Sequence, residues 1–388
     1  MAENNRSKKA EATHGFLYWL YWLIKKFPRS QRLHVLCDYL SLYRKKGLMV
    51  DEYYDFEFEK RNSAFRDSFL GKNEARYYVD LLNPKKYYIL ARNKYLAHRV
   101  LEDAGIRMPN LLCYYQPEGA YYGDGDCAGD FRGVCRILSG KDVQSCVIKG
   151  AESAHGDSVW VVKSIAYKEN GDALLTGIDD RHILLSEILK SNSMLFESVV
   201  HQTKQFSSFN ETSVNTIRFM TTLYPNGEAR IVAIWFKVGR AGRCVDNAGG
   251  GGNIDGAVDI TTGKLYNVHQ FDGWRDSKKI ECHPDSGTRI EGVIIENWDK
   301  IKAEVIRFQQ AFPYCKAAGW DVALTDDGPT VIEVNDLWDA TGQYFIGQGW
   351  REDIRKCYLE WVNLGRDYSL RRWSNMLKQS HLLHIVER

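Results

Sequence analysis

Residues 319–335 read GWDVALTDDGPTVIEVN, and this stretch decides how the rest of the chain is interpreted. An extended segment through Asp321–Leu324 is followed by turn residues at 326–329 and by a second extended segment over 330–334. The stretch therefore predicts a β-hairpin.

The acidic and amide side chains of this hairpin are expected on one surface. Side chains alternate between the two faces of a strand, so Glu333 and Asn335 point to the same side, and Asp321 can lie beside them across the turn. Two carboxylates and an amide oxygen are the hard ligands that Mg²⁺ takes when nucleotide phosphates complete its coordination. A hairpin without a ligand is the alternative, but such a hairpin gains nothing from bringing two acids and an amide together.

Length and composition indicate a globular protein of two or three fused subdomains. The chain has 388 residues, 44% hydrophobic residues and a net charge of +2. This near-neutral balance gives no reason to expect nucleic acid as a partner. The nine cysteines form no Cys-x-x-Cys pair, and no secretory signal opens the chain. We therefore expect reduced thiols and a cytoplasmic location.

The N-terminal segment is basic and rich in aromatic residues. Residues 1–50 hold ten Lys and Arg against three Asp and Glu, and the apolar and aromatic run 15–24 is followed by Lys25 and Lys26. Ten such residues cannot span a bilayer, which needs about 20. One interpretation is a helix buried against the body of the protein. The other is peripheral contact of residues 15–32 with an anionic membrane surface.

Apolar spacing predicts a mostly helical region up to about residue 90. Asn93 is then a candidate N-cap for a helix that Gly105 closes. Further along we expect strands at 145–149 and 159–165, a helix at 179–192, a strand at 193–200 that enters a new subdomain, a long hairpin over 216–238 and a helix at 298–312.

Two features indicate contact with a ligand, and the first of them indicates contact with phosphate. Lys149 ends an apolar strand and precedes a small polar loop that holds Gly150 and Gly156, a shape that lets backbone N–H groups approach anionic oxygens. Residues 249–252 are four consecutive glycines inside a basic loop. Such a run costs considerable chain entropy, and close approach of the backbone to a ligand is the favoured reason for it.

The order of these motifs carries a family resemblance. They are Asn93-Lys94, Val147-Ile-Lys149, Leu195-Phe-Glu197, Ser213-Val-Asn-Thr-Ile-Arg218, Val245-Asp-Asn247, and Asp321 with Glu333-Val-Asn335. Over about residues 90–345 the chain resembles the ATP-grasp superfamily. More narrowly, it looks like the sugar-transfer-associated ATP-grasp proteins of bacterial polysaccharide clusters. Lys237 departs from the pattern, since relatives tend to have arginine there.

Pattern and resemblance together imply an α+β protein with the ATP-grasp fold, in which two α/β subdomains sandwich ATP. Residues 1–90 would form an all-helical N-terminal region. Residues 91–192 would form the small subdomain that carries both ATP-binding lysines, and 193–350 the second subdomain with the metal site. Residues 351–388 would form C-terminal helices.

The resemblance implies four residues around the nucleotide. Lys94 and Lys149 would grip the α- and β-phosphates of ATP, and Glu197 would lie at the segment that binds the adenine edge. Arg218 would face the γ-phosphate. Lys149 and Arg218 are therefore candidates for stabilising the transferred phosphoryl group.

The remaining implied site residues concern the metal and the acceptor. Asp321, Glu333 and Asn335 would hold one or two Mg²⁺ ions. Asn247 would bind near ATP, and Arg243, a further catalytic candidate, would lie near the phosphates or the acceptor.

The implied activity is that of an ADP-forming carboxylate–amine ligase. A carboxylate attacks the γ-phosphate of ATP to give an acyl phosphate, and an amine then displaces phosphate to form an amide. The family context implies a small-molecule or sugar-linked carboxylate and an amine, used in making a cell-surface polysaccharide such as a capsule. Two alternatives stay open: a phosphotransferase acting on a hydroxyl, and a non-catalytic nucleotide-binding scaffold of a glycan assembly complex.

Overall fold

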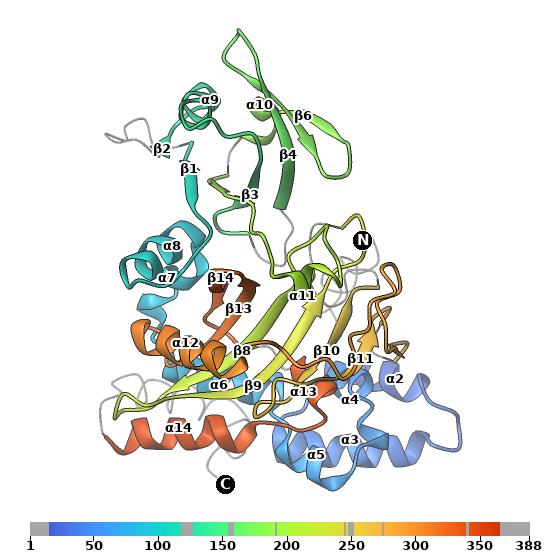
Figure 1. Cartoon of the computed structure of the whole chain (residues 1–388). Coiled ribbons are helices and arrows are strands. Elements are labelled where there is room, and N and C mark those ends of the chain that lie inside the picture. Colours follow the sequence, from blue (N-terminus) through green and yellow to red (C-terminus); the bar gives the residue numbers. More distant parts are fainter. Residues whose placement is uncertain are drawn as a thin grey trace.

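Two seven-stranded sheets organise the part of the chain that the computed structural model describes. That part comprises residues 15–117, 127–153, 159–190, 192–243, 246, 252–273, 275–338 and 341–364. In Figure 1 the first sheet lies at the top of the molecule and the second sheet lies below it, surrounded by helices.

The first sheet has the strand order β2-β1-β7-β3-β4-β5-β6, and only β1 and β2 pair in parallel. Helix α9 (Phe131–Gly140) packs on it with the buried side chains of Val134 and Leu138. The strands are β1 (Leu111–Tyr115), β2 (Cys127–Ala128), β3 (Cys146–Gly150), β4 (Val159–Tyr167), β5 (Ala173–Gly177), β6 (His182–Leu184) and β7 (Met194–Glu197).

Two expectations about the end of this sheet are wrong. Strand β7 pairs with β1 and β3, so residues 193–200 complete the first sheet and do not open the second. All four β7 residues are buried, and a short apolar run says nothing about which sheet it joins. Residues 179–192 contain strand β6 and the single turn α10 (Leu185–Ile188) in place of the expected helix.

The second sheet is antiparallel, in the order β12-β11-β10-β9-β8-β13-β14. The alternation of side chains gives it two buried faces. On β9, Ile234 and Phe236 belong to one apolar cluster, whereas Trp235 belongs to another. The strands are β8 (Thr216–Leu223), β9 (Ala229–Val238), β10 (Ile254–Val258), β11 (Leu265–Gln270), β12 (Lys278–Lys279), β13 (Ala317–Thr325) and β14 (Gly328–Asn335).

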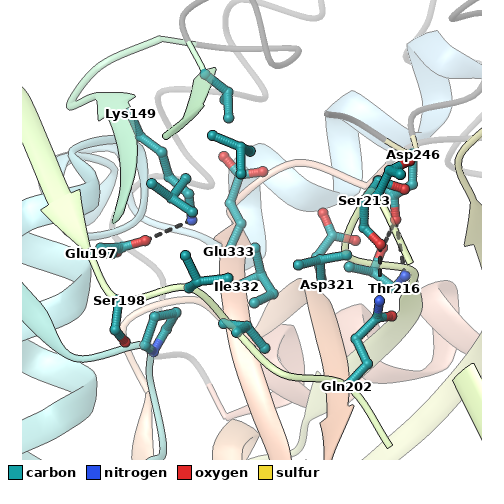
Figure 2. Close-up of a pocket in the computed structure, with 18 of the residues that line it drawn as sticks. Lys149, Glu197, Ser198, Gln202, Ser213, Thr216, Asp246, Asp321, Ile332 and Glu333 are labelled. Atoms are coloured by element: carbon teal, nitrogen blue, oxygen red, sulfur yellow. Dashed lines mark hydrogen bonds and ion pairs between the residues drawn. The ribbon is translucent and has the colours of Figure 1, made fainter. Parts of the chain in front are cut away.

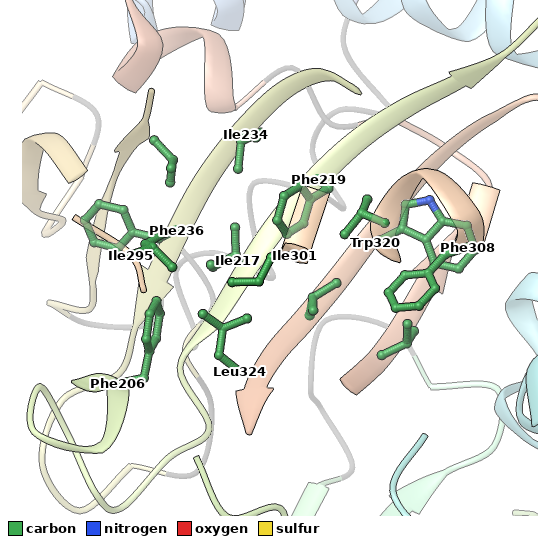
Figure 3. Packing of buried hydrophobic residues seen from close by; sticks show 14 of the residues in the cluster. Phe206, Ile217, Phe219, Ile234, Phe236, Ile295, Ile301, Phe308, Trp320 and Leu324 are labelled. Atoms are coloured by element: carbon green, nitrogen blue, oxygen red, sulfur yellow. The ribbon is translucent and has the colours of Figure 1, made fainter. Parts of the chain in front are cut away.

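Helices cover both faces of the second sheet. On one face α12 (Trp298–Ala311) packs Ile301 and Phe308 against Phe219 and Trp320 (Figure 3). On the other face, α6 (Lys72–Leu82) and α14 (Arg351–Asn363) contribute to the cluster around Trp235. The predicted helix at 298–312 and the long hairpin β8–β9 are thus confirmed.

Helix α8 (Lys94–Asp103) begins at Asn93, whose side chain accepts a hydrogen bond from the Leu96 amide, as the sequence predicts. Its buried Ala97 and Leu101 join the core of the second sheet, although the proposed subdomain 91–192 groups this helix with the first. The apolar stripe of a helix does not reveal which neighbour it packs against.

The N-terminal region is all-helical over its described residues, as expected. Its four N-terminal helices share an apolar cluster with Ala257 of β10, Phe271, and Tyr344 and Phe345 of α13 (Gly342–Ile346), so they pack against the β10 region of the second sheet. The helices are α2 (Phe16–Lys25), α3 (Arg32–Lys46), α4 (Val50–Asp55), α5 (Ser63–Ser68), α6 and α7 (Ile89–Arg92), with 3₁₀ turns at Phe58–Lys60 and Lys85–Tyr87.

The C-terminal helices are represented by α14, and residues 365–388 lie outside the described part of the chain. Within the described ranges, no helix combines the length and the apolar character needed to cross a membrane.

Candidate functional site

The hairpin β13–β14 forms at the predicted place, with its turn at residues 326–327. Asp321 pairs with Glu333 across the two strands, and Asn335 pairs with Gly319. The register shifts between Asp321 and Val322, because Val322 pairs with Val331 and leaves Ile332 as the extra residue of a β-bulge. The bulge breaks the alternation of side chains, so the neighbours Ile332 and Glu333 both reach the same cavity.

This cavity has a volume of about 460 Å³ and is lined by residues from both sheets. Figure 2 shows Lys149 and Glu197 entering it from the first sheet, and Asp321 and Glu333 from the second. Its apolar walls are formed by Val147, Val159, Val161, Ile178, Val199, Val200 and Ile332.

Lys94 is held at the cavity by the loop that follows β3. Its backbone N–H donates to the carbonyl of Ala151, and its Nζ donates to the carbonyl of Ser153 at 2.5 Å. The same Nζ lies 3.2 Å from Glu333 Oε1. Lys94 therefore joins α8, the first sheet and the metal-candidate hairpin at one point.

Lys149 and Glu197 form the second ion pair of the cavity. Their side chains project from the adjacent strands β3 and β7, with Lys149 Nζ 2.7 Å from Glu197 Oε2. The two side chains are only 12% and 5% exposed, so water screens this pair weakly. Glu197 is thus an ion-pair partner of the phosphate-candidate lysine.

Four charged groups form a buried cluster on the second sheet. Arg218 donates two hydrogen bonds to Asp321, at 2.5 and 2.7 Å, and Lys237 Nζ lies 3.1 Å from the same carboxylate. Lys237 is also 3.8 Å from Asp246, which accepts hydrogen bonds from the backbone N–H and the hydroxyl of Thr216. Two cations and two carboxylates make the cluster formally neutral.

Burial and pairing act against each other on the carboxyl groups of this cluster. For Asp321, burial alone would raise the pKa, but the charges of Arg218 and Lys237 outweigh it and hold the pKa well below its ordinary value. For Asp246 the balance is reversed, since burial raises the pKa by more than Lys237 lowers it. Asp321 is therefore the firmly ionised member.

The oxygen donors at the end of the hairpin fit a divalent cation that shares its ligands with phosphate. Among the described residues, no three His, Cys, Asp or Glu side chains converge to hold a metal unaided. Asn335, however, carries a buried amide Nδ2 that has no hydrogen-bond partner. A half-turn of this amide exchanges nitrogen for oxygen, so Asn335 can offer an oxygen donor two positions after Glu333 on the same strand, although Asn335 does not itself line the cavity.

Apart from Asn335, the sequence analysis predicts eight site residues, and the structure gathers five of them around one cavity. Lys94, Lys149, Glu197, Asp321 and Glu333 line it. The remaining three lie apart in different ways: Arg218 binds the cavity-lining Asp321, Arg243 lies exposed and does not line the cavity, and Asn247 lies outside the described residues.

Several cavity residues were not among the predicted site residues. Asp246 stands inside a quoted motif and Lys237 was noted only as a departure, yet both line the cavity. The apolar wall follows the alternation Val147 and Lys149 on β3, with Val159 and Val161 on β4. Valines spaced two positions apart, or two positions before the phosphate-candidate lysine, could therefore have predicted this apolar wall from the sequence.

Comparison with known proteins places the chain in a family. It matches the family described as sugar-transfer associated ATP-grasp over residues 73–357, which is well over half of its length. A search of curated proteins finds no match.

Solved structures with distant similarity include three enzymes. Phosphoribosylamine–glycine ligase from Thermotoga maritima has 14% identity and a TM-score of 0.43, over 73% of this chain and 57% of that one. Biotin carboxylase from Campylobacter jejuni has 11% identity and a TM-score of 0.41, over 69% and 46%. D-alanine–D-alanine ligase from Bacillus anthracis has 14% identity and a TM-score of 0.36, over 74% and 70%.

The chain spans about half the length of the first solved structures that it matches. The family match extends from α6 to α14 and so includes both sheets and the cavity between them. The expected α+β fold class is confirmed, and the chain belongs to the sugar-transfer associated ATP-grasp family.

Proposed function

We propose that this protein is an ATP-dependent carboxylate–amine ligase that forms an amide through an acyl phosphate. The observation that carries the proposal is the meeting of Lys94 and Lys149 with Asp321 and Glu333 in one cavity that also has an apolar wall. Cations suit the phosphates of ATP, the apolar wall suits its base, and carboxylates suit Mg²⁺.

The apolar wall and the strand end at Glu197 would hold the adenine. Val147 and Val161 of the first sheet and Ile332 of the second line the same cavity, which would give a flat base apolar surface to contact from both sheets. Because Glu197 also binds Lys149, its carboxylate would fix the lysine beside the nucleotide. The phosphates would then lie between Lys149 and Lys94.

Binding of Mg·ATP would exchange the ion pairs of the cavity. Lys94 is paired with Glu333, and Lys149 with Glu197. Phosphate oxygens would take over the lysines, and Glu333 would then be released toward the metal together with Asn335. The metal, when bound, neutralises phosphate charge. Each carboxylate thus balances the charge of one lysine of the cavity.

Arg218 would act next to the transferred phosphoryl group. Its guanidinium is held by the firmly ionised Asp321, which fixes its position on β8. Lys237 shares that carboxylate and adds a second buried cation at the same end of the cavity. Two cations there would stabilise the charge that develops when a substrate carboxylate attacks the γ-phosphate. Arg243 and Asn247 remain proposed contacts on the acceptor side.

The proposed setting is cytoplasmic, and the proposed substrates are a small-molecule or sugar-linked carboxylate and an amine of a polysaccharide precursor such as that of a capsule. The description of the family as sugar-transfer associated supports this class of substrate. Mg²⁺ and ATP are the proposed cofactor and energy source.

Isotope transfer distinguishes this reaction from the alternatives. An ADP-release screen over uronic acids and amino acids, each with a panel of amines, identifies the substrates. The identified acid, labelled with ¹⁸O in its carboxylate, should then deliver one labelled oxygen to the released phosphate. A stable phosphorylated product without free phosphate would identify a phosphotransferase and overturn the proposal. Nucleotide binding with no turnover across the panel would instead support a scaffold.

A further inference from the structure

Helix α2 turns one side away from the rest of the protein. At about 100° per residue, Leu17, Tyr18, Tyr21 and Lys25 fall within about 100° of the helix circumference. We name these four residues the α2 outer face. Leu17 is 78% exposed and Tyr21 is 56% exposed, whereas Leu23, on the opposite side, is fully buried.

The inner side of α2 already satisfies the packing needs of the helix. Trp19, Leu20 and Trp22 pack against the N-terminal apolar cluster, and Trp22 lies edge-on to Tyr54 with ring centroids 5.3 Å apart. The exposed Leu17 and Tyr21 do not belong to this cluster, so its packing does not account for their apolar surface. Exposed large apolar side chains that gather on one element mark an interaction surface.

The chain segment that carries the α2 outer face is strongly basic. From residue 15 to residue 47 the chain has seven Lys and Arg and a single acid, Asp38. That acid is engaged, because it accepts hydrogen bonds from Tyr53 and Arg66. Lys25 of the face is exposed, and further exposed cations stand at positions 26, 29, 44 and 45 of the same chain segment.

We propose that the α2 outer face and the exposed cations of its chain segment bind the surface of an anionic lipid bilayer. Ten helical residues extend only about 15 Å, so α2 lies along the surface and does not cross it. Tyr18 and Tyr21 place apolar rings with polar hydroxyl tips at the depth of the headgroups, and Leu17 enters the acyl boundary. Lys25 and Arg29 contact anionic headgroups.

The position of α2 suits this role. It lies at the margin of the molecule on the side of the N-terminal helices, away from the first sheet at the top of Figure 1. The residues that line the nucleotide-candidate cavity all lie outside the N-terminal helices α2–α6. Membrane binding would therefore leave these cavity residues untouched, and the inference does not depend on the ligase reaction.

Vesicle cosedimentation with the full-length chain tests the inference without ATP. Vesicles made of phosphatidylcholine alone are compared with vesicles made of equal parts of phosphatidylcholine and phosphatidylglycerol, at low and at high ionic strength. We expect binding to the anionic vesicles only, and loss of that binding at high salt. The double variant Lys25→Glu/Arg29→Glu should bind on the order of 30-fold more weakly, since each basic residue near a membrane contributes about five-fold.

Matched control variants test whether binding depends on the α2 outer face itself or only on the net charge and the exposed apolar area of the protein. The double variant Lys278→Glu/Lys279→Glu makes the same charge change at exposed positions on β12 and should bind normally. Leu17→Ser/Tyr21→Ser should weaken binding by about 10-fold or more, whereas Leu359→Ser, at a 40% exposed position on α14, should not. Circular dichroism should show all four variants folded.

Two kinds of result would overturn the inference. One is a failure of specific binding, seen either as no binding to anionic vesicles at low ionic strength or as equal loss in the α2 and the control variants. The other is a dimer in light scattering that Leu17→Ser/Tyr21→Ser splits while vesicles leave the wild type in solution. That second result would show that the α2 outer face binds a second copy of this chain. Both results are independent of any ADP-release measurement, so they leave the proposed reaction untouched.

Discussion

Replacement of Glu333 by glutamine should change nucleotide affinity in opposite directions with and without magnesium. Without the metal, Glu333 competes with phosphate for Lys94, whose Nζ lies 3.2 Å from Oε1. The substitution removes this competitor and should strengthen metal-free ATP binding. With the metal, Glu333 is a proposed ligand, so the same substitution should weaken Mg·ATP binding.

The size of both changes follows from the geometry. At 3.2 Å the pair has a gross attraction of about 5 kcal/mol for an effective dielectric constant of about 20. The Glu333 side chain is 33% exposed, and screening leaves a net value of about 1 kcal/mol. Metal-free ATP should therefore bind up to about five-fold more tightly. Loss of a carboxylate that directly holds the metal should weaken Mg·ATP binding by at least about 10-fold.

Titration calorimetry with ATP, once in excess Mg²⁺ and once in excess chelator, measures both changes on one variant. Glu281→Gln is the matched control, since this glutamate is exposed and lies outside the cavity, and it should change neither affinity. Equal losses in the two conditions would mean that Glu333 only supports the fold. Unchanged affinity in Mg²⁺ would exclude Glu333 as a metal ligand, and the assignment of the metal site to this hairpin would be refuted.

Three further predictions concern stability, measured by urea unfolding. Asp321→Asn leaves two buried cations undercompensated and should cost about 3 to 5 kcal/mol; a loss below about 1 kcal/mol would show that solvent reaches the cluster. Gly349→Ala should cost about 2 kcal/mol or more, because an added Cβ would lie 2.1 Å from the backbone oxygen of Ser68; unchanged stability would mean that the N-terminal helices do not pack there as described. Burial raises the pKa of Glu52 to about 7, so the folded state favours its protonated form, and up to about 3 kcal/mol of stability should be lost as the pH rises from about 5 to about 8. Glu52→Gln should flatten that slope, and an equally steep slope in the variant would assign it to other groups.

The sequence predicted those parts of the site whose geometry is local. The hairpin of residues 319–335 combines strand residues with a turn, and pairing outward from that turn brings Asp321 close to Glu333 on the opposite strand. Lys149 at the end of β3 and the Asn93 cap of α8 are local features of the same kind. Features of this kind can be predicted because they depend only on residues close together in the sequence.

The parts that the sequence did not predict depend on contacts between distant segments. The bulge at Ile332, which brings two consecutive side chains into the cavity, depends on register with β13. The pairing of Lys149 with Glu197 needs β3 and β7 to be neighbours, and the sequence had assigned β7 to the other sheet. Likewise, the role of Lys237 depends on Asp321, 84 positions further along the chain, folding back against it.

The central claim is that the cavity between the two sheets binds Mg·ATP. A crystal structure of the chain with Mg²⁺ and a non-hydrolysable ATP analogue tests it most directly. We expect the adenine against Val147 and Ile332, the phosphates within hydrogen-bond distance of Lys94 and Lys149, and the metal on Glu333. A nucleotide bound elsewhere, or bound in this cavity while the pair between Lys94 and Glu333 stays intact, would contradict the account.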